Sequence, residues 1–364
     1  MGIRWLALAV VVLLSSGCAA RVSAPPAAST PETSAAAADQ IGPAPAVRVT
    51  GTVATGLQVP WGIAWLPDGS ALVSERDTAR IFRVGRGSPR QVAAVDGVAP
   101  RGEGGLLGIA YSPGWLYAYY TAADDNRVVR MAWDGATLGS PQEILTAIPK
   151  AGIHNGGRIM FGPDGLLYIA TGDAGGADLA QDPDSLAGKI LRVTPEGSVP
   201  RDNPFTGSPV FSLGHRNVQG LAFDSRGRLW ASEFGQSDVD ELNLVAAGSN
   251  YGWPDCEGAC ATAPYTDPVV EWQPTSVASP SGLAIIGDYA YVASLRGETV
   301  WQVPLNASAS DGPGAPISLA LGDLGRLRTI VATPEGGLWL STSNTDGRGD
   351  PRDGDDRILA LTVN

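Results

Sequence analysis

Short apolar runs, paired across a turn, recur along most of this chain. The pair at residues 158–170 reads Arg-Ile-Met-Phe, then Gly-Pro-Asp-Gly, then Leu-Leu-Tyr-Ile-Ala. Runs of this length with turn residues between them predict a β-hairpin. Six related hairpins cover residues 62–75, 108–119, 158–170, 220–233, 282–294 and 329–341.

A further apolar run follows these hairpins, as at residues 80–84, 189–193, 299–303 and 357–361. Because no single sheet of this kind buries both of its faces, the repeats must stack. The pattern predicts an all-β fold: a six-bladed β-propeller of four-stranded antiparallel blades over residues 47–364. Residues 47–54 are expected to help close the ring with the last blade. The alternative, a β-sandwich, does not explain a hairpin that repeats in this way.

The first residues carry a targeting signal. Arg4 precedes an apolar segment, residues 5–14, that is too short to span a bilayer comfortably. Residues 1–18 resemble a bacterial lipoprotein signal with lipidation at Cys18, and an ordinary secretory signal is the alternative. Residues 19–46 are rich in Ala, Pro, Ser and Thr and predict a flexible linker. Either signal makes the mature chain extracytoplasmic, held by lipid at the outer face of the bacterial cell membrane or periplasmic.

Composition narrows the partners. The 364 residues carry a net charge of −12, so nucleic acid is not an expected partner. The 47 glycines and 28 prolines favour strands and tight turns over long helices. Cys256 and Cys260 predict a local disulfide in an oxidising compartment; with no histidine nearby they are a weak zinc signal.

One hairpin carries a candidate catalytic pair. His154 precedes the hairpin at residues 158–170, and Asp173 follows it. The two ends of a hairpin open on the same edge, so these side chains are expected to lie together at one mouth of the propeller channel. A carboxylate beside an imidazole fixes the tautomer and makes a general base. The alternative is a structural hydrogen bond.

Other polar residues flank the strands that should line the channel. Arg216 and Asn217 precede the fourth hairpin and are suited to clamping an anion or a polarised oxygen. The acidic run at residues 233–243 indicates either calcium or a solvated acidic turn. Glu103 lies in the Gly-rich entry to the second blade.

Three arginines lie near the last two blades, namely Arg296, Arg326 and Arg328. Arg326 and Arg328 are two residues apart on a predicted strand and therefore point to the same face. We expect all three guanidinium groups near the channel, where in an acidic protein they favour a bound polyanion or polycarboxylate.

Four stretches carry a resemblance to a known family: LGHRNVQGLAF at 213–223, SEFGQSDVDELNL at 232–244, GSNYGWP at 248–254 and GKILRVTPEGSVPRDNPF at 188–205. With the loops above, they resemble the soluble sugar dehydrogenases that depend on pyrroloquinoline quinone (PQQ), the glucose/sorbosone and aldose sugar dehydrogenase family. The resemblance covers nearly all of the chain after the linker. It implies PQQ and Ca²⁺ as cofactors, an aldose sugar as substrate, and a quinone, cytochrome or dye as external electron acceptor.

The resemblance also implies roles for individual residues. His154 takes the proton of the anomeric hydroxyl, Asp173 orients His154 beside the sugar, and hydride passes from C1 to C5 of the quinone to give a lactone. Further catalytic or substrate contacts are Arg216, Glu103 and Trp272. The cofactor-binding residues are Arg216, Asn217, Arg296, Arg326, Arg328 and Glu103. The metal ligands are the carbonyls of Gly235 and Gln236, with Asp240 at a nearby calcium site.

The chain departs from the glucose dehydrogenase form of that family. Glu103 and Arg296 stand where that form has Gln and Lys, and the segment between Pro254 and Trp272 is short. A compact, monomeric aldose dehydrogenase of broad substrate range is the closer match. Two other functions compete: a non-catalytic ligand- or protein-binding propeller of the same ancestry, and a propeller hydrolase with a channel metal, which the cationic channel disfavours.

Overall fold

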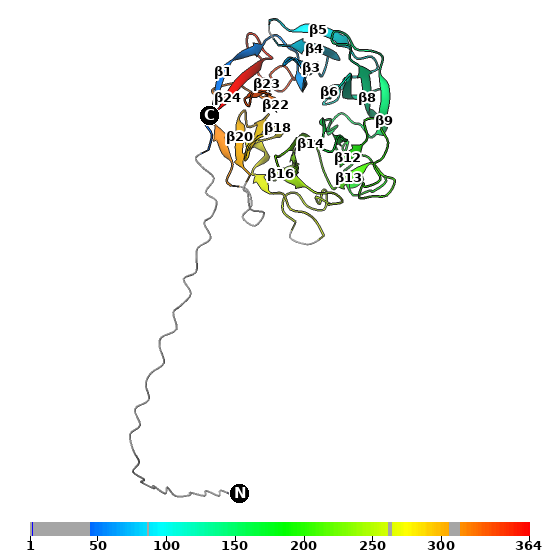
Figure 1. The fold of residues 1–364 in the computed structure, drawn as a ribbon. Helices are drawn as coiled ribbons and strands as arrows, with labels where there is room; N and C mark the ends of the chain where they lie inside the picture. The colour runs from blue at the N-terminus through cyan, green and yellow to red at the C-terminus, as the bar shows by residue number, and fades with distance from the viewer. Residues whose placement is uncertain (1, 3–43, 86, 261–263, 306–313) are drawn as a thin grey trace, which may run out of the picture. The chain divides into compact units, whose positions relative to one another are not determined.

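The structure is a computed structural model that describes residues 2, 44–85, 87–260, 264–305 and 314–364. Within these ranges, six four-stranded antiparallel sheets stand in a ring around a common axis (Figure 1). The predicted six-bladed β-propeller is therefore confirmed. The same residues form two short 3-10 helices, η1 (Ala177–Ala180) and η2 (Thr275–Val277), and no α-helix.

The first five blades place their strands in chain order from the axis outward, and the outermost strand of the last blade comes from the start of the propeller. The first three blades are β2 (Pro60–Trp65), β3 (Ala71–Glu75), β4 (Arg80–Val84) and β5 (Arg90–Ala94); β6 (Leu106–Ser112), β7 (Trp115–Thr121), β8 (Asn126–Ala132) and β9 (Gln142–Ile148); and β10 (Ile159–Phe161), β11 (Leu167–Ala170), β12 (Lys189–Val193) and β13 (Val210–Leu213). The next two are β14 (Val218–Phe223), β15 (Leu229–Glu233), β16 (Asp240–Val245) and β17 (Val270–Trp272); and β18 (Pro280–Ile286), β19 (Tyr289–Ser294), β20 (Val300–Pro304) and β21 (Ile317–Leu319). The last blade is β22 (Leu327–Ala332), β23 (Leu338–Thr342), β24 (Ile358–Val363) and β1 (Val47–Ala54).

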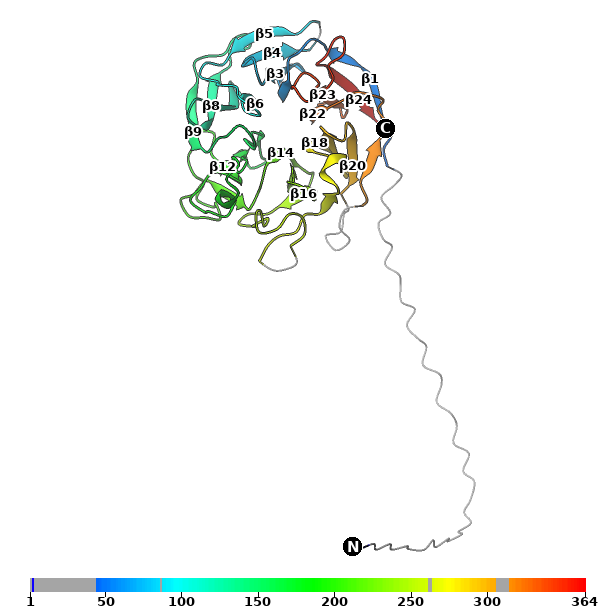
Figure 2. The ribbon, with the colours of Figure 1, turned by 180° about the vertical axis from the view of Figure 1, so that it is seen from behind.

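The two ends of the propeller close the ring together. β1 pairs antiparallel with β24, as expected for residues 47–54, and the blue and red strands lie side by side in both views (Figure 2). Ala46 and Asn364 exchange two backbone hydrogen bonds of 2.7 and 3.0 Å, and Gln302 Nε2 donates to the Pro45 carbonyl at 3.0 Å. These bonds attach Pro45 and Ala46, the last residues of the expected linker, to the propeller.

Cys18 and nearly all of the predicted signal and linker lie outside the described residues. In the part of the chain that is described, there is no helix with the length and apolar character needed to cross a membrane.

Apolar side chains fill the space between neighbouring blades. Between the first two blades, Leu72, Ile81, Leu106, Leu116 and Met131 are at most 2% exposed and belong to one cluster. Burying a side chain of this size contributes roughly 1.5–3 kcal/mol. The hydrophobic faces of the sheets thus stabilise the ring and leave the loops at its two mouths free to carry polar groups.

The innermost strands of all six blades begin at one mouth of the channel, which we call the site mouth. They end at the hairpin turns, at the opposite or turn mouth. A cavity of about 420 Å³ opens among the turn-mouth ends of these strands, with apolar side chains such as Trp65, Tyr111, Phe161 and Phe223 around it. Arg158 is the one charged residue in its lining. The converging polar groups lie instead at the site mouth.

Candidate active site

His154 and Asp173 lie together at the site mouth, as predicted. His154 precedes β10 and Asp173 follows β11, and these two strands pair in one hairpin. The ring nitrogen His154 Nδ1 is 2.8 Å from Asp173 Oδ1. The two loops also pack backbone to backbone, because a Cβ at Gly172 would lie 2.0 Å from the His154 carbonyl oxygen. Only glycine fits there, so the local sequence fixes the approach of the pair.

Asp173 is held as an ionised carboxylate. It is 1% exposed, and Oδ1 also accepts the Gly175 backbone N–H at 2.7 Å, while Oδ2 accepts Trp253 Nε1–H at 2.9 Å. Burial acts to raise the pKa of Asp173, but the hydrogen bonds from His154, Gly175 and Trp253 lower it below its usual value. The carboxylate therefore keeps a proton on Nδ1 and leaves Nε2 of His154, whose side chain is 14% exposed, for a ligand.

Glu103 connects three blades across the mouth. Its Oε2 accepts the His154 backbone N–H at 2.9 Å, and its Oε1 forms an ion pair with Arg348 Nη1 at 2.9 Å. Arg348 comes from the loop between β23 and β24 of the last blade. Burial acts to raise the pKa of Glu103, but His154 and Arg348 lower it overall. Sequence reasoning missed Arg348, because one arginine in a loop of Gly and Asp gives no signal of its own.

Arg216 and Asn217 enter from the loop before β14, and Glu233 fixes their position. Glu233 Oε1 accepts both backbone N–H groups. Asn217 Oδ1 accepts the Gly156 N–H at 3.1 Å, and Arg216 Nη1 donates to the Gly235 carbonyl at 2.6 Å. Two donors remain: Arg216 Nε and Asn217 Nδ2 are buried and find no hydrogen-bond partner within the described ranges. A buried donor without an acceptor is costly, so a ligand that supplies one here would be stabilised.

Arg326 and Arg328 share one carboxylate and therefore point to one face, as the spacing predicted. Arg326 Nε is 3.0 Å and Arg328 Nη2 is 3.9 Å from Asp346 Oδ2. Arg328 Nη1 also donates to Gln219 Oε1 at 3.1 Å, whereas its Nε is buried and unpaired among the residues described. Burial lowers the pKa of Arg328 to about 9. Two buried guanidinium groups thus form ion pairs with one carboxylate among the described residues.

A narrow pocket at the site mouth has Glu103, Arg328 and Arg348 in its lining. The others are Trp61, Asn155, Gly156, Gln219, Phe234 and Leu295. Its volume is about 20 Å³, so a ligand much larger than a water enters only when a lining side chain moves. Arg348, whose side chain is 58% exposed, is the charged member of the lining that is least held by its surroundings.

Of the predicted site residues, Glu103 and Arg328 line this pocket, and two others, Arg296 and Trp272, have no hydrogen bond or ion pair, in the described part of the chain, to the polar groups described above. Arg296 follows β19 and its side chain is exposed, although its neighbour Leu295 lines the pocket. Trp272 ends β17, the outer strand of blade four, is 3% exposed and packs near Trp301 with 6.1 Å between ring centres. A buried indole in the core between blades is not positioned to contact a sugar.

In the acidic run at residues 233–243, residues 236–238 are exposed, whereas Asp240 begins β16 and is buried. Asp240 is 1% exposed; its Oδ1 accepts the Gly235 N–H at 2.9 Å and its Oδ2 accepts the Ser279 N–H at 2.7 Å. Burial raises the pKa of Asp240 to about 6. Within the described parts of the chain, no three His, Cys, Asp or Glu side chains are grouped to hold a metal. Any calcium here depends on backbone carbonyls such as those of Gly235 and Gln236.

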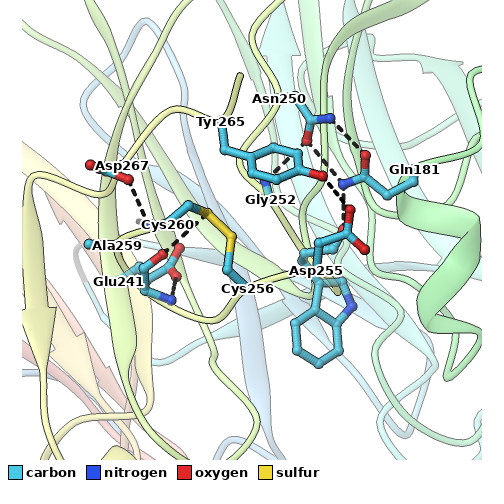
Figure 3. Close-up of a disulfide and its surroundings, with 12 residues drawn as sticks. Gln181, Glu241, Asn250, Gly252, Asp255, Cys256, Ala259, Cys260, Tyr265 and Asp267 are labelled. Atoms are coloured by element: carbon cyan, nitrogen blue, oxygen red, sulfur yellow. Dashed lines mark hydrogen bonds between the residues drawn. A yellow bond between two sulfur atoms is a disulfide. The ribbon is translucent and has the colours of Figure 1, made fainter. Parts of the chain in front are cut away.

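The predicted disulfide between Cys256 and Cys260 is present (Figure 3). Between the two cysteines, Glu257 Oε1 accepts the backbone N–H groups of residues 236–239 at 2.6–3.2 Å. On the other side of the bridge, Asn250 and Gln181 form a double amide contact of 2.7 and 3.0 Å. The disulfide therefore stabilises the loop that carries Gly235 and Gln236.

The second histidine, His215, is structural. It is fully buried, with Nδ1 2.9 Å from Glu233 Oε2 and Nε2 2.9 Å from Ser212 Oγ. Its ring stacks on Tyr251 with 4.7 Å between centres. Both nitrogens are in use, which leaves His154 as the histidine that faces the pocket region.

Comparison with known proteins gives a family and several relatives. The family model described as Glucose / Sorbosone dehydrogenase matches residues 57–351. The chain is similar to the PQQ-bound form of aldose sugar dehydrogenase (Adh) from Streptomyces coelicolor, at 52% identity and a TM-score of 0.84 over 88% of this chain and 99% of that one. It is also 33% identical over 249 residues to quinoprotein glucose dehydrogenase B of Acinetobacter calcoaceticus, covering 57% of this chain and 52% of that protein. Aldose sugar dehydrogenase YliI of Escherichia coli is 28% identical over 337 residues, covering 80% and 89%.

Proposed function

Because the chain belongs to the glucose/sorbosone dehydrogenase family, we propose that it oxidises aldose sugars at C1 to lactones with PQQ as the hydride acceptor. Its relatives are quinoprotein and aldose sugar dehydrogenases, and the chain is an oxidoreductase of that kind. One observation carries the proposal: a carboxylate-held imidazole, His154, opens on the same mouth as buried guanidinium groups with too few negative partners.

His154 acts as the general base. Its Nε2 takes the proton of the anomeric hydroxyl, and Asp173 then stabilises the imidazolium through the 2.8 Å contact to Nδ1. The bonds from Gly175 and Trp253 keep Asp173 a poor proton acceptor, so the proton stays on the histidine. Glu103 is suited to accepting hydrogen bonds from sugar hydroxyls once Arg348 has moved away.

The unpaired donors are suited to holding the cofactor. When bound, PQQ supplies the quinone carbonyl carbon that accepts the hydride. Arg326 and Arg328 would bind its carboxylates, and Arg328 Nε is a buried donor that lacks an acceptor. Arg216 Nε and Asn217 Nδ2 are two further such donors, suited to the quinone oxygens. The donor set thus fits a planar, triply acidic ligand in kind, and the narrow pocket has to widen to admit it.

Calcium is part of the proposal. The carbonyls of Gly235 and Gln236 would bind the ion, and Asp240 supports them through its bond to the Gly235 N–H. Oxygen donors of this kind suit Ca²⁺, which would draw electron density from the quinone. In the structure the Arg216 guanidinium donates to the Gly235 carbonyl oxygen, whose second lone pair would remain for the ion.

The sequence signals add a location and an electron acceptor to the proposal. The N-terminal segment supports an extracytoplasmic enzyme, anchored through Cys18 if the lipoprotein signal is used. An external quinone, cytochrome or dye would reoxidise the cofactor. The short segment between blades four and five supports a monomer.

Reconstitution tests the proposal. Purified apoprotein is mixed with PQQ and Ca²⁺, and reduction of a phenazine or indophenol dye is followed with several aldoses. We expect sugar-dependent reduction that needs both additions, and its loss in His154→Ala with quinone binding retained. A protein that binds no quinone and reduces no dye would refute the proposal. Quinone binding without dye reduction for any aldose would instead favour a non-catalytic binding propeller.

A further inference from the structure

The innermost strands approach one another closely at one level of the channel. The first position of their shared motif is glycine in four blades, Arg158 in blade three and Thr329 in blade six. The glycines are Gly62, Gly108, Gly220 and Gly282. At Gly108, a Cβ would lie 2.2 Å from the Gly157 carbonyl oxygen of the next strand. Glycine is therefore required for this approach, and the channel is narrow at the level where the Arg158 side chain enters it.

The Arg158 side chain crosses the channel at this level. From blade three, Nε donates to the Gln219 carbonyl of blade four at 2.9 Å and Nη2 donates to Thr329 Oγ1 of blade six at 3.1 Å. Nη1 reaches the Trp61 carbonyl of blade one at 3.4 Å, and the guanidinium lies 4.2 Å from the centre of the Trp61 ring. Trp61 and Gln219 line the polar pocket, whereas Arg158 lines the apolar cavity. Arg158 is thus the partition between the two.

Among the residues that the structure describes, no carboxylate forms an ion pair with Arg158. Its three hydrogen-bond acceptors are two carbonyls and a hydroxyl, all uncharged. Burial and then the charge of Arg328 lower the pKa of Arg158 to about 9, which leaves it positive at neutral pH. Arg326 and Arg328 share Asp346, which is the one carboxylate among the described residues that forms an ion pair with any of the three buried guanidinium groups. Buried charge without a partner is costly, and an anionic ligand in the pocket above would offset this cost.

We propose that Arg158 is a positioning residue for the anionic cofactor, which closes the floor of the pocket and attracts the carboxylates of the cofactor through its charge. The inference rests on the proposed function, which supplies a cofactor with three carboxylates. Arg326 and Arg328 are the contact residues in that function, whereas Arg158 acts from beneath them without contact. The Arg158 side chain also separates the polar pocket from the apolar cavity, and it therefore limits how deeply the bound quinone can enter the channel.

Equilibrium binding to the apoprotein tests this role without any turnover. Quenching of tryptophan fluorescence reports the affinity for PQQ and for its trimethyl ester, which has the same rings and no carboxylate charge. Arg158→Met removes the charge at similar length, and Arg158→Lys retains it. Arg90→Met, on the exposed outer strand β5, is the matched control for net charge. Thermal unfolding of each apoprotein shows whether it is folded. If Arg158→Met does not fold, Arg158→Gln takes its place.

We expect Arg158→Met to bind PQQ at least about tenfold more weakly, because a unit charge is removed from a low-dielectric site. Arg158→Lys and Arg90→Met should stay within about threefold of the wild type, and the ester should lose little affinity in any variant. Equal affinity of wild type and Arg158→Met for PQQ would overturn this inference and leave the proposed function intact. An equal loss for acid and ester would also overturn it, since shape and not charge would then be the cause. A wild type that binds no quinone would refute the proposed function itself.

Discussion

Replacing Asp173 by asparagine tests the catalytic pair with the smallest change in shape. The carboxylate presents two acceptors to three donors, namely His154 Nδ1–H, the Gly175 N–H and Trp253 Nε1–H. An amide presents one acceptor oxygen and one NH₂ group, which only donates. In one orientation its NH₂ group faces Trp253, and in the other it faces both Gly175 and His154. Neither orientation satisfies all three partners.

The magnitude follows from these contacts. A buried donor that loses its acceptor costs about 1–3 kcal/mol, which is the expected loss of unfolding free energy. In the second orientation the imidazole places its proton on Nε2 and can no longer act as a base. Loss of a general base lowers the rate by roughly 10²–10⁴-fold, or about 3–5 kcal/mol of barrier. We therefore expect kcat of Asp173→Asn to fall within that range.

The assay is steady-state dye reduction by the quinone-loaded protein, with quinone affinity measured on the same samples. Asp124→Asn, at an exposed position of the β7–β8 turn, is the matched control and should behave as the wild type. The affinity for PQQ should change little in Asp173→Asn, because Asp173 is not among the proposed cofactor contacts. A kcat within threefold of the wild type would refute the assignment of the pair as an oriented general base.

Three other changes test separate parts of the structure. Asp346→Asn should lower the unfolding free energy by about 3–5 kcal/mol at pH 7, since buried guanidinium groups lose their carboxylate. Burial acts to raise the pKa of Asp346, but the arginines hold it below its usual value. The stabilisation is therefore present above about pH 4 and is lost as the pH falls further. A difference between the urea unfolding midpoints of wild type and variant that does not shrink at pH 3 contradicts this. Arg348→Gln frees Glu103 from an exposed ion pair worth at most about 1 kcal/mol, so stopped-flow association of PQQ should speed up by no more than about fivefold; slower association would show that the contact does not cover the pocket. Serine at both Cys256 and Cys260 should cost about 2 kcal/mol in chemical denaturation, as expected for so short a loop, and an unchanged midpoint would count against a stabilising disulfide.

The fold was predictable because its information is local. Strand, turn and strand alternate within about a dozen residues, and the third strand was placed correctly at Arg80–Val84 and Lys189–Val193. The pairing of His154 with Asp173 follows from hairpin geometry, and the shared face of Arg326 and Arg328 follows from strand periodicity. Each of these predictions needs only one blade.

Contacts between blades were not predictable in this way. Arg348 meets Glu103, Trp253 meets Asp173, and Arg158 meets Trp61, and each pair joins different blades of the ring. The spacing of residues in the sequence does not determine which loops of different blades contact each other. The same limit explains why the predicted sugar contact of Trp272 did not match its position. An aromatic side chain is equally suited to a sugar and to a hydrophobic core, and Trp272 lies on an outer strand and is buried in the core.

Because β1 pairs with β24, the ring can close only after the C-terminal strand has been made. Thr50 donates to the Ala360 carbonyl 310 residues later. During synthesis β1 therefore stays unpaired until β24 has left the ribosome. A chain that stops early leaves β1 without its partner, and the blade that should close the ring keeps an open edge. Unpaired strand edges promote aggregation. A truncated chain that lacks β24 therefore exposes an inner edge that the full-length propeller pairs, and it should aggregate more readily.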